Sequence, residues 1–105
     1  NIIAVGVDDE SILKAINLVV QDKGGISCVQ NDASKVIGLP VAGLMSTADP
    51  YQVANDYIEI DKMAKSLGTQ LGSPFMTLSF MALLVIPHIK MSDLGLFDGD
   101  QFKLY

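Results

Sequence analysis

Positively charged side chains are scarce in this sequence of 105 residues. It has no arginine, and twelve aspartates and glutamates outnumber its seven lysines, which gives a formal net charge of −5. Nucleic-acid binding depends on clustered lysine and arginine side chains that neutralise phosphates. The lysines form no such cluster, so we expect no nucleic-acid partner.

A single cysteine and a single histidine limit the chemistry that the chain can perform. Cys28 cannot form an internal disulfide and has no CxxC partner, which fits a cytoplasmic protein; we expect it to be a small core residue in a strand. His88 has no second histidine or cysteine to complete a metal set, so we expect it at the surface or at a strand end. The sequence therefore predicts no catalytic residue and no metal or other cofactor bound by this chain.

No segment is typical of a membrane span or a secretion signal. The uncharged stretch Leu71–Ile89 is interrupted by polar residues and prolines close to its ends. A membrane-spanning helix needs about 20 mostly apolar residues. The N-terminus also lacks the basic and then apolar layout of a signal peptide. We expect a cytoplasmic location and no contact with a membrane.

The length fits one domain over residues 1–105, but that domain is unusually apolar. Half of the residues are hydrophobic and 18% are charged. A domain of this size leaves about 30–40% of its unfolded-chain surface exposed. The surplus of apolar side chains therefore indicates either an unusually apolar core or a permanent interface with another domain or subunit. The sequence also opens at Asn1 inside a β-branched run, without an initiator methionine. We expect it to be one domain cut from a larger protein.

Apolar spacing and capping residues predict two main helices. Asp8 and Asp9 are N-cap candidates for the first, and capping explains this pair better than cation binding does. Gly24-Gly25 ends this helix and does not form a phosphate-binding loop. Asp49-Pro50 starts the second helix, which should run for about five turns. Its apolar stripe consists of Val53, Tyr57, Ile60, Ala64 and Leu67.

The remaining segments predict strands. Ile2–Val7 is typical of a buried strand, and Ile26–Gln30 with Lys35–Leu39 predicts a hairpin. Pro40–Ser46 is either a bent strand or a loop. Phe75–Ile86 alternates with a two-residue period, which favours a strand over the helix that is also open.

The C-terminal segments Ile89–Phe97 and Gln101–Tyr105 predict edge strands or extended chain. We therefore expect an α/β (α+β) fold: a mixed, largely antiparallel sheet of about five or six strands, with two main helices packed on it. Asp93, Asp98 and Asp100 fail the spacing of a calcium loop, so we expect them to form turns.

Methionines, a phenylalanine and hydroxyl side chains recur in two segments and could surround a small planar ligand. Packing in the core is the alternative for the methionines. The candidate pocket-wall residues are Met45, Ser46, Phe75, Met76, Thr77 and Ser79.

Three stretches together resemble the C-terminal domain of bacterial adenine deaminase, in the amidohydrolase superfamily. They are Asn1–Gly6, Leu39–Ser46, and Pro74–Phe80 running on to Ile86-Pro87 and Asp93–Leu96. Their order and spacing agree with the family over nearly all of the sequence. The family has a His-Asp-Ser-His sequence just before the position that matches Asn1.

The resemblance implies a parent enzyme that hydrolyses adenine to hypoxanthine and ammonia in purine salvage. In this family a (β/α)8 barrel holds manganese or iron, and metal-activated hydroxide attacks C6 of adenine. The C-terminal domain packs near the barrel mouth. This chain would be inactive alone, its partner would be the missing N-terminal metal-binding barrel, and the six candidate residues would wall the adenine pocket. Homo-oligomerisation stays open.

Two other functions remain open from the residues alone. One is a self-contained module that binds a small molecule, and the other is a purely structural dimerisation domain. Both could use the same fold, because a fold does not determine a function.

Overall fold

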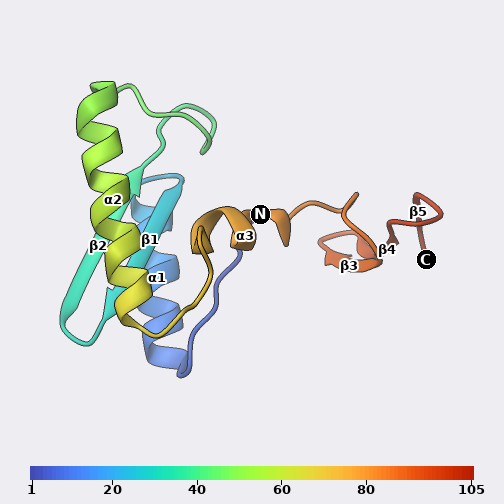
Figure 1. The fold of residues 1–105 in the computed structure, drawn as a ribbon. Helices are drawn as coiled ribbons and strands as arrows, with labels where there is room; N and C mark the ends of the chain where they lie inside the picture. Colours follow the sequence, from blue (N-terminus) through green and yellow to red (C-terminus); the bar gives the residue numbers. More distant parts are fainter. The chain divides into compact units, whose positions relative to one another are not determined.

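The computed structural model describes residues 1–105 as an α+β fold with three helices and two small antiparallel sheets (Figure 1). The chain divides into two compact units, each described here by itself. We call residues 4–74 the hairpin unit, and residues 1–3 with 75–105 the C-terminal unit. That residues 1–105 form one domain of a larger enzyme stays a prediction.

Both helices of the hairpin unit begin where their capping residues predict. Helix α1 spans Asp9–Gln21, and its N-cap residue Asp8 accepts a hydrogen bond of 2.8 Å from the backbone N–H of Ser11. This bond lowers the pKa of the Asp8 carboxyl. Helix α2 spans Pro50–Ser66, and the Asp49 carboxylate caps it. Capping by Asp8 and the start at Asp49-Pro50 are confirmed.

The predicted hairpin is also confirmed, with a tighter turn than expected. Strand β1 (Gly25–Gln30) pairs antiparallel with β2 (Ala33–Gly38), so that Gln30 lies opposite Ala33. Only Asn31 and Asp32 separate the strands, and Asn31 adopts a φ of 53°. Asparagine tolerates this left-handed conformation, which two-residue hairpin turns favour.

The hairpin lies between α1 and α2, with one helix on each face. Side chains alternate between the faces of a strand. Ser27 donates a hydrogen bond of 2.8 Å to the carbonyl of Ala15 in α1. Lys35 contacts acidic side chains of α2, which places its cross-strand partner Cys28 on that second face. Figure 1 shows α2 in front of the hairpin and α1 behind it.

The core of the hairpin unit is small and lies between the hairpin and α2. Its buried apolar side chains are Cys28, Ile37 and Ile60, and Ile60 is fully buried. Burial raises the pKa of the Cys28 thiol. Cys28 is therefore a core residue in a strand, as predicted.

The N-terminal run does not form the buried strand that its composition predicts. Residues 1–6 have no regular secondary structure, and Val5 and Val7 are exposed. β-branched side chains favour a strand only when a neighbouring strand and a covering surface are present. The prediction for Ile2–Val7 is wrong for this structure because the run pairs with neither sheet.

The strand predicted over Phe75–Ile86 is also wrong. The structure has helix α3 at Pro74–Phe80, followed by successive turns to Pro87. With only Thr77 and Ser79 as polar side chains, a two-residue period over so short a run does not distinguish strand from helix. Proline at the first helical position is the signal that favours the helix, as it does at Pro50.

The C-terminal unit contains a three-stranded antiparallel sheet. Its strands are β3 (Ile89–Ser92), β4 (Gly95–Asp98) and β5 (Lys103–Leu104), in the order β3-β4-β5. Extended chain near the C-terminus is thus confirmed. The predicted single mixed sheet is corrected: five strands form two separate antiparallel sheets, since Ile2–Val7 and Phe75–Ile86 contribute no strand to join them. None of the helices has the length and hydropathy needed to cross a membrane.

Candidate functional site

An open hollow lies beside the N-terminal half of α2. Its volume is about 740 Å³, and its lining is largely apolar. Two of the six candidate pocket-wall residues, Met45 and Ser46, line it. The complete lining is Met45, Ser46, Ala48, Pro50, Val53, Ala54, Tyr57 and Ile58.

A tight loop positions Met45 and Ser46 at this hollow. Val41 and Met45 form an isolated antiparallel bridge, and the amides of Leu44 and Met45 both donate to the carbonyl of Val41. The loop of residues 40–46 is therefore the alternative that the structure selects over a bent strand. The Ser46 hydroxyl accepts a hydrogen bond of 3.1 Å from the backbone N–H of Ala48. Because Ser46 is the acceptor in this bond, the proton of its hydroxyl can be donated to a ligand.

The other four candidates lie on α3. Met76 is 55% exposed, and the Ser79 hydroxyl donates a 2.7 Å hydrogen bond to the Met76 carbonyl within the helix. Phe75 and Thr77 belong to the same short helix. Because α3 and the hollow are described in different units, a single pocket wall of all six residues stays a prediction.

The sequence did not reveal which side chains would complete the hollow. Val53 and Tyr57, which belong to the predicted apolar stripe of α2, are half-buried and also line the hollow. The sequence feature that could have indicated the hollow is the pair of small side chains, Ala48 and Ala54, which leave space around the start of the helix.

An ion-paired cluster links the hairpin to α2, and sequence reasoning also missed it. The Lys35 ammonium lies 3.1 Å from Asp56 and also pairs with Glu59. These two carboxylates raise the pKa of Lys35, Glu59 being the stronger cause. The Gln52 amide donates to Asp56 at 3.0 Å. The sequence feature that could have indicated this cluster is a pair of acids three residues apart on a predicted helix, together with a lysine on a predicted strand.

Acid should weaken this cluster, and replacing Asp56 by asparagine tests it. The Gln52 amide first, and the Lys35 ammonium second, hold the pKa of Asp56 below its ordinary value. A lowered pKa stabilises the fold above the unfolded-state pKa of about 3.9, and this stabilisation is lost as the pH falls through the folded-state pKa. Asp56→Asn should therefore be less stable than the parent chain near neutral pH, and the difference should shrink in acid.

Urea unfolding of both chains from about pH 7 down to about pH 2 measures this difference. Asp61→Asn, which removes the partner of Lys65 within α2, is the matched control. A difference between Asp56→Asn and the parent chain that stays constant over this range would contradict the assignment.

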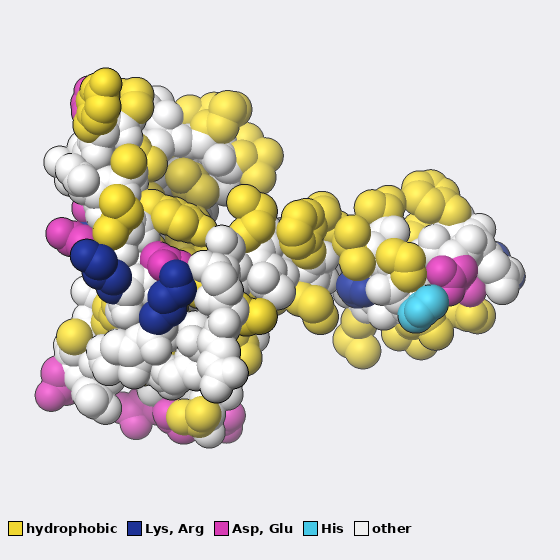
Figure 2. Space-filling view, viewed as in Figure 1, with side chains coloured by type: hydrophobic (Ala, Val, Ile, Leu, Met, Phe, Trp, Pro, Cys, Tyr) yellow, Lys and Arg dark blue, Asp and Glu magenta, His cyan; other side chains and the backbone are white.

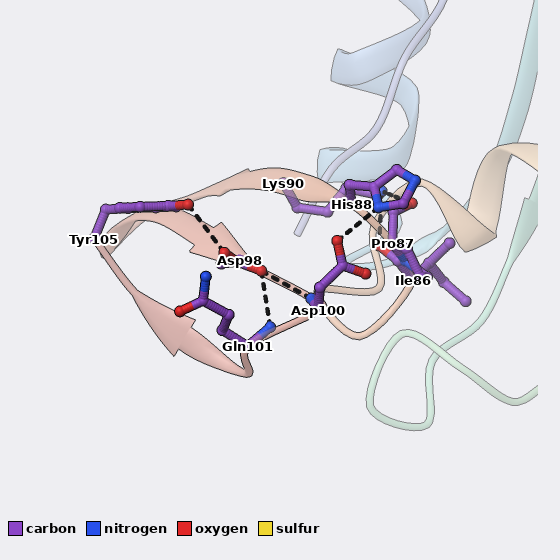
Figure 3. Close-up of polar contacts among 8 residues, drawn as sticks. All are labelled: Ile86, Pro87, His88, Lys90, Asp98, Asp100, Gln101 and Tyr105. Carbon is purple, nitrogen blue, oxygen red and sulfur yellow. Dashed lines mark hydrogen bonds and ion pairs between the residues drawn. The ribbon is translucent and has the colours of Figure 1, made fainter.

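His88 and Asp100 form an exposed pair in the C-terminal unit (Figure 3). Nδ1 of His88 lies 2.6 Å from Oδ2 of Asp100, and the His88 side chain is 81% exposed. Lys90 donates to the carbonyls of Ile86 and Pro87, at 2.9 and 3.2 Å, and so fixes the backbone before the histidine. His88 is a surface residue just before β3, as predicted. A carboxylate on Nδ1 orients an imidazole, but no nucleophile of the unit is shown contacting it.

Asp98 organises the turn that carries Asp100. It is buried, its carboxylate accepts the backbone N–H groups of Asp100 and Gln101 at 2.9 Å, and it accepts the Tyr105 hydroxyl at 2.9 Å (Figure 3). The hydrogen bond from the backbone N–H of Gln101 is the main cause that lowers the pKa of Asp98. The Asp98 carboxylate in turn raises the pKa of Tyr105. Asp98 and Asp100 thus form a turn, as expected. No set of three or more His, Cys, Asp or Glu side chains is placed to hold a metal ion.

Sequence comparison places the whole chain among known proteins. Residues 1–103 match the family described as the adenine deaminase C-terminal domain. An adenine deaminase from Sulfurovum sp. strain NBC37-1 is 53% identical over 103 residues, which cover 97% of this chain and 19% of that protein. Proteins of the same name are 52% identical in Methanosarcina acetivorans, over 98% of this chain, and 48% identical in Borreliella burgdorferi, over 97%. In each, this chain spans 19% of the length.

No solved structure matches the chain. The likeness therefore concerns sequence and family.

Proposed function

Because this chain belongs to the family of adenine deaminase C-terminal domains, we propose that it is the accessory domain of an enzyme that hydrolyses adenine to hypoxanthine and ammonia. One observation carries the proposal: the chain is about half identical to curated adenine deaminases across almost its whole length, yet it spans 19% of theirs. The remaining length accommodates a separate catalytic region. Purine salvage in the cytoplasm is the setting that we propose.

The metal of this enzyme, manganese or iron, belongs to that catalytic region. The residues of this chain do not fit it, since no three potential ligands come together. We assign the metal ligands to an N-terminal barrel, and no reaction step follows from them here.

The isolated chain of 105 residues should show no turnover of adenine above background, with or without added manganese. Measurable turnover would overturn this account.

The part of the reaction assigned to this chain is to wall the purine pocket. Met45 and Ser46 lie at an open, largely apolar hollow, where an apolar side chain can cover a planar ring and a hydroxyl can orient it. Phe75 and Thr77 on α3 offer the same combination. Covering the ring also excludes water, which strengthens polar interactions with the substrate.

Single substitutions in the full-length enzyme test the wall. For Met45→Ala, Ser46→Ala, Phe75→Ala and Thr77→Val, we expect kcat/KM with adenine to fall roughly tenfold each, the effect of losing one hydrogen bond or part of an apolar contact. Leu94→Ala is the control, because Leu94 lies 75% exposed in the turn between β3 and β4. Unchanged kinetics in all four variants would end the pocket-wall proposal.

A further inference from the structure

Asp98 and Gly99 form the one place in the sequence where an aspartate or an asparagine precedes a glycine. In such a pair, the backbone nitrogen of the glycine can attack the side-chain carboxyl carbon of the aspartate and close a succinimide ring. Glycine favours this attack because it has no Cβ to crowd the nitrogen and because its backbone reaches conformations that other residues avoid. The fold therefore decides whether the ring can close here.

The fold keeps the Asp98 carboxyl in an unreactive form. Asp98 is buried, and its carboxylate accepts the backbone N–H groups of Asp100 and Gln101 and the hydroxyl of Tyr105, each at 2.9 Å (Figure 3). These donors, the Gln101 N–H first among them, hold the pKa of Asp98 below its ordinary value, so the group stays ionised near neutral pH. An ionised carboxylate resists a nucleophile, because it would have to expel an oxide ion.

The fold also restrains the nitrogen that would attack. The backbone N–H of Gly99 donates a hydrogen bond of 2.7 Å to the carbonyl of His88. Attack requires the nitrogen to give up this proton and to turn toward the Asp98 side chain, and both changes break that bond. The Lys90 ammonium donates to the carbonyls of Ile86 and Pro87 and so holds the chain just before the acceptor. All these contacts lie within the C-terminal unit.

A short terminal strand closes the turn that carries this pair. Strand β5 is two residues long and pairs only with β4. Tyr105, the last residue, donates its backbone N–H to the carbonyl of Leu96 at 3.0 Å and its hydroxyl to Asp98. Chain ends held by so few bonds open readily. Figure 2 shows acidic side chains of this unit at its surface beside the histidine, so water reaches the turn when it opens.

We propose that Asp98-Gly99 is a site of spontaneous isomerisation to isoaspartate, which the folded turn of residues 98–101 keeps closed and which opens when β5 separates from β4. In the open turn, the Gly99 nitrogen bonds to the side-chain carboxyl carbon of Asp98, and water leaves with the carboxyl hydroxyl and the amide proton. A second water then cleaves the bond between the Gly99 nitrogen and the backbone carbonyl carbon of Asp98. The chain is left linked through the side chain, with its mass unchanged and no other reactant consumed.

The product cannot rebuild the turn. Its backbone is longer by one methylene, and the free carboxylate is now attached directly to Cα. The N–H groups of Asp100 and Gln101 and the hydroxyl of Tyr105 therefore lose their acceptor. The longer backbone also displaces Asp100, whose carboxylate lies 2.6 Å from Nδ1 of His88. Isomerisation thus converts a reversible opening of the β4–β5 end into a permanent one. This inference is independent of the proposed function.

Ageing of the full-length protein near neutral pH, both folded and unfolded in guanidinium chloride, tests the proposal. Enzymatic methylation of the new carboxylate counts isoaspartate, and peptide mass spectrometry locates it. Isomerisation at Asp98 should be slower by roughly tenfold or more in the folded protein, because its rate follows the fraction of open turn. In the unfolded protein, Gly99→Ala should suppress it. Equal rates in the folded and unfolded protein would overturn the closure, and no isoaspartate at Asp98 in the unfolded protein would overturn the site.

Tyr105→Phe makes the test specific to the turn. The variant loses the hydroxyl that donates to Asp98, so isomerisation in the folded protein should rise roughly tenfold, the effect of losing one hydrogen bond to a charged group. The rate in the unfolded protein should not change. Tyr51→Phe is the control, because Tyr51 lies on α2 in the hairpin unit. A folded Tyr105→Phe protein that isomerises at the parent rate would overturn the closure by this turn. The parent protein, compared folded and unfolded, decides the question if Tyr105→Phe does not fold.

Discussion

Replacing Ile60 by alanine is expected to lower the free energy of unfolding of the chain by about 2–5 kcal/mol. Ile60 lies in α2 and is the one fully buried large side chain of the structure. Its removal costs the transfer free energy of the lost methyl and methylene groups, and it leaves a cavity between α2 and the hairpin. Since only Cys28 and Ile37 share that core, few neighbours can move to fill the space.

Urea unfolding followed by circular dichroism measures the loss, with the m-value as a check that the folded state is unchanged. Ile58→Ala is the matched control, because Ile58 lies two residues earlier in the same helix and is 50% exposed. We expect this control to cost less than about 1 kcal/mol. Equal losses for the two variants would show that α2 does not pack on the hairpin through Ile60.

The parts of the fold that were predicted from sequence are those that local chemistry decides. An aspartate followed by a proline starts α2, and Asp8 caps α1, whatever the rest of the chain does. The hairpin likewise follows from Asn31-Asp32 between two β-prone runs. In each case, backbone groups and a nearby side chain satisfy one another within a few residues.

The failures lie where an element depends on distant partners. Ile2–Val7 has the composition of a strand, but a strand needs a neighbour that its own residues do not specify. Phe75–Ile86 has only two polar side chains, Thr77 and Ser79, so its pattern did not distinguish a helix from a strand. Both segments expose apolar side chains in the structure.

The candidate site was predictable to the same degree. Met45 and Ser46 were selected for their side-chain chemistry, and they line a hollow. Apart from Ala48, the rest of that lining comes from α2, where helix periodicity placed Val53 and Tyr57 in one apolar stripe. Periodicity shows which side chains share a helix face, but the packing of the loop of residues 40–46 decides what covers that face.

Replacing Gly25 by alanine should cost about 2–6 kcal/mol, through two separate effects. Gly25 begins β1 with a φ of +153°, and an added Cβ would lie 2.3 Å from the carbonyl oxygen of Ile37 on β2. Backbone strain of this kind costs about 1–3 kcal/mol. Forcing an atom into a packed site costs about 1–3 kcal/mol more.

Two other glycines separate these effects. Gly68 has a φ of +107° but open space around it, so Gly68→Ala should show the cost of strain alone. Gly72 has neither strain nor a near neighbour, and Gly72→Ala should be neutral or slightly stabilising because alanine restricts the unfolded chain. The expected order of stability, measured by urea unfolding, is Gly72→Ala above Gly68→Ala above Gly25→Ala. If Gly25→Ala matched Gly68→Ala, the β1 backbone could move away from Ile37 without loss. The register that carries Lys35 to its partners on α2 would then have to be fixed elsewhere in the hairpin.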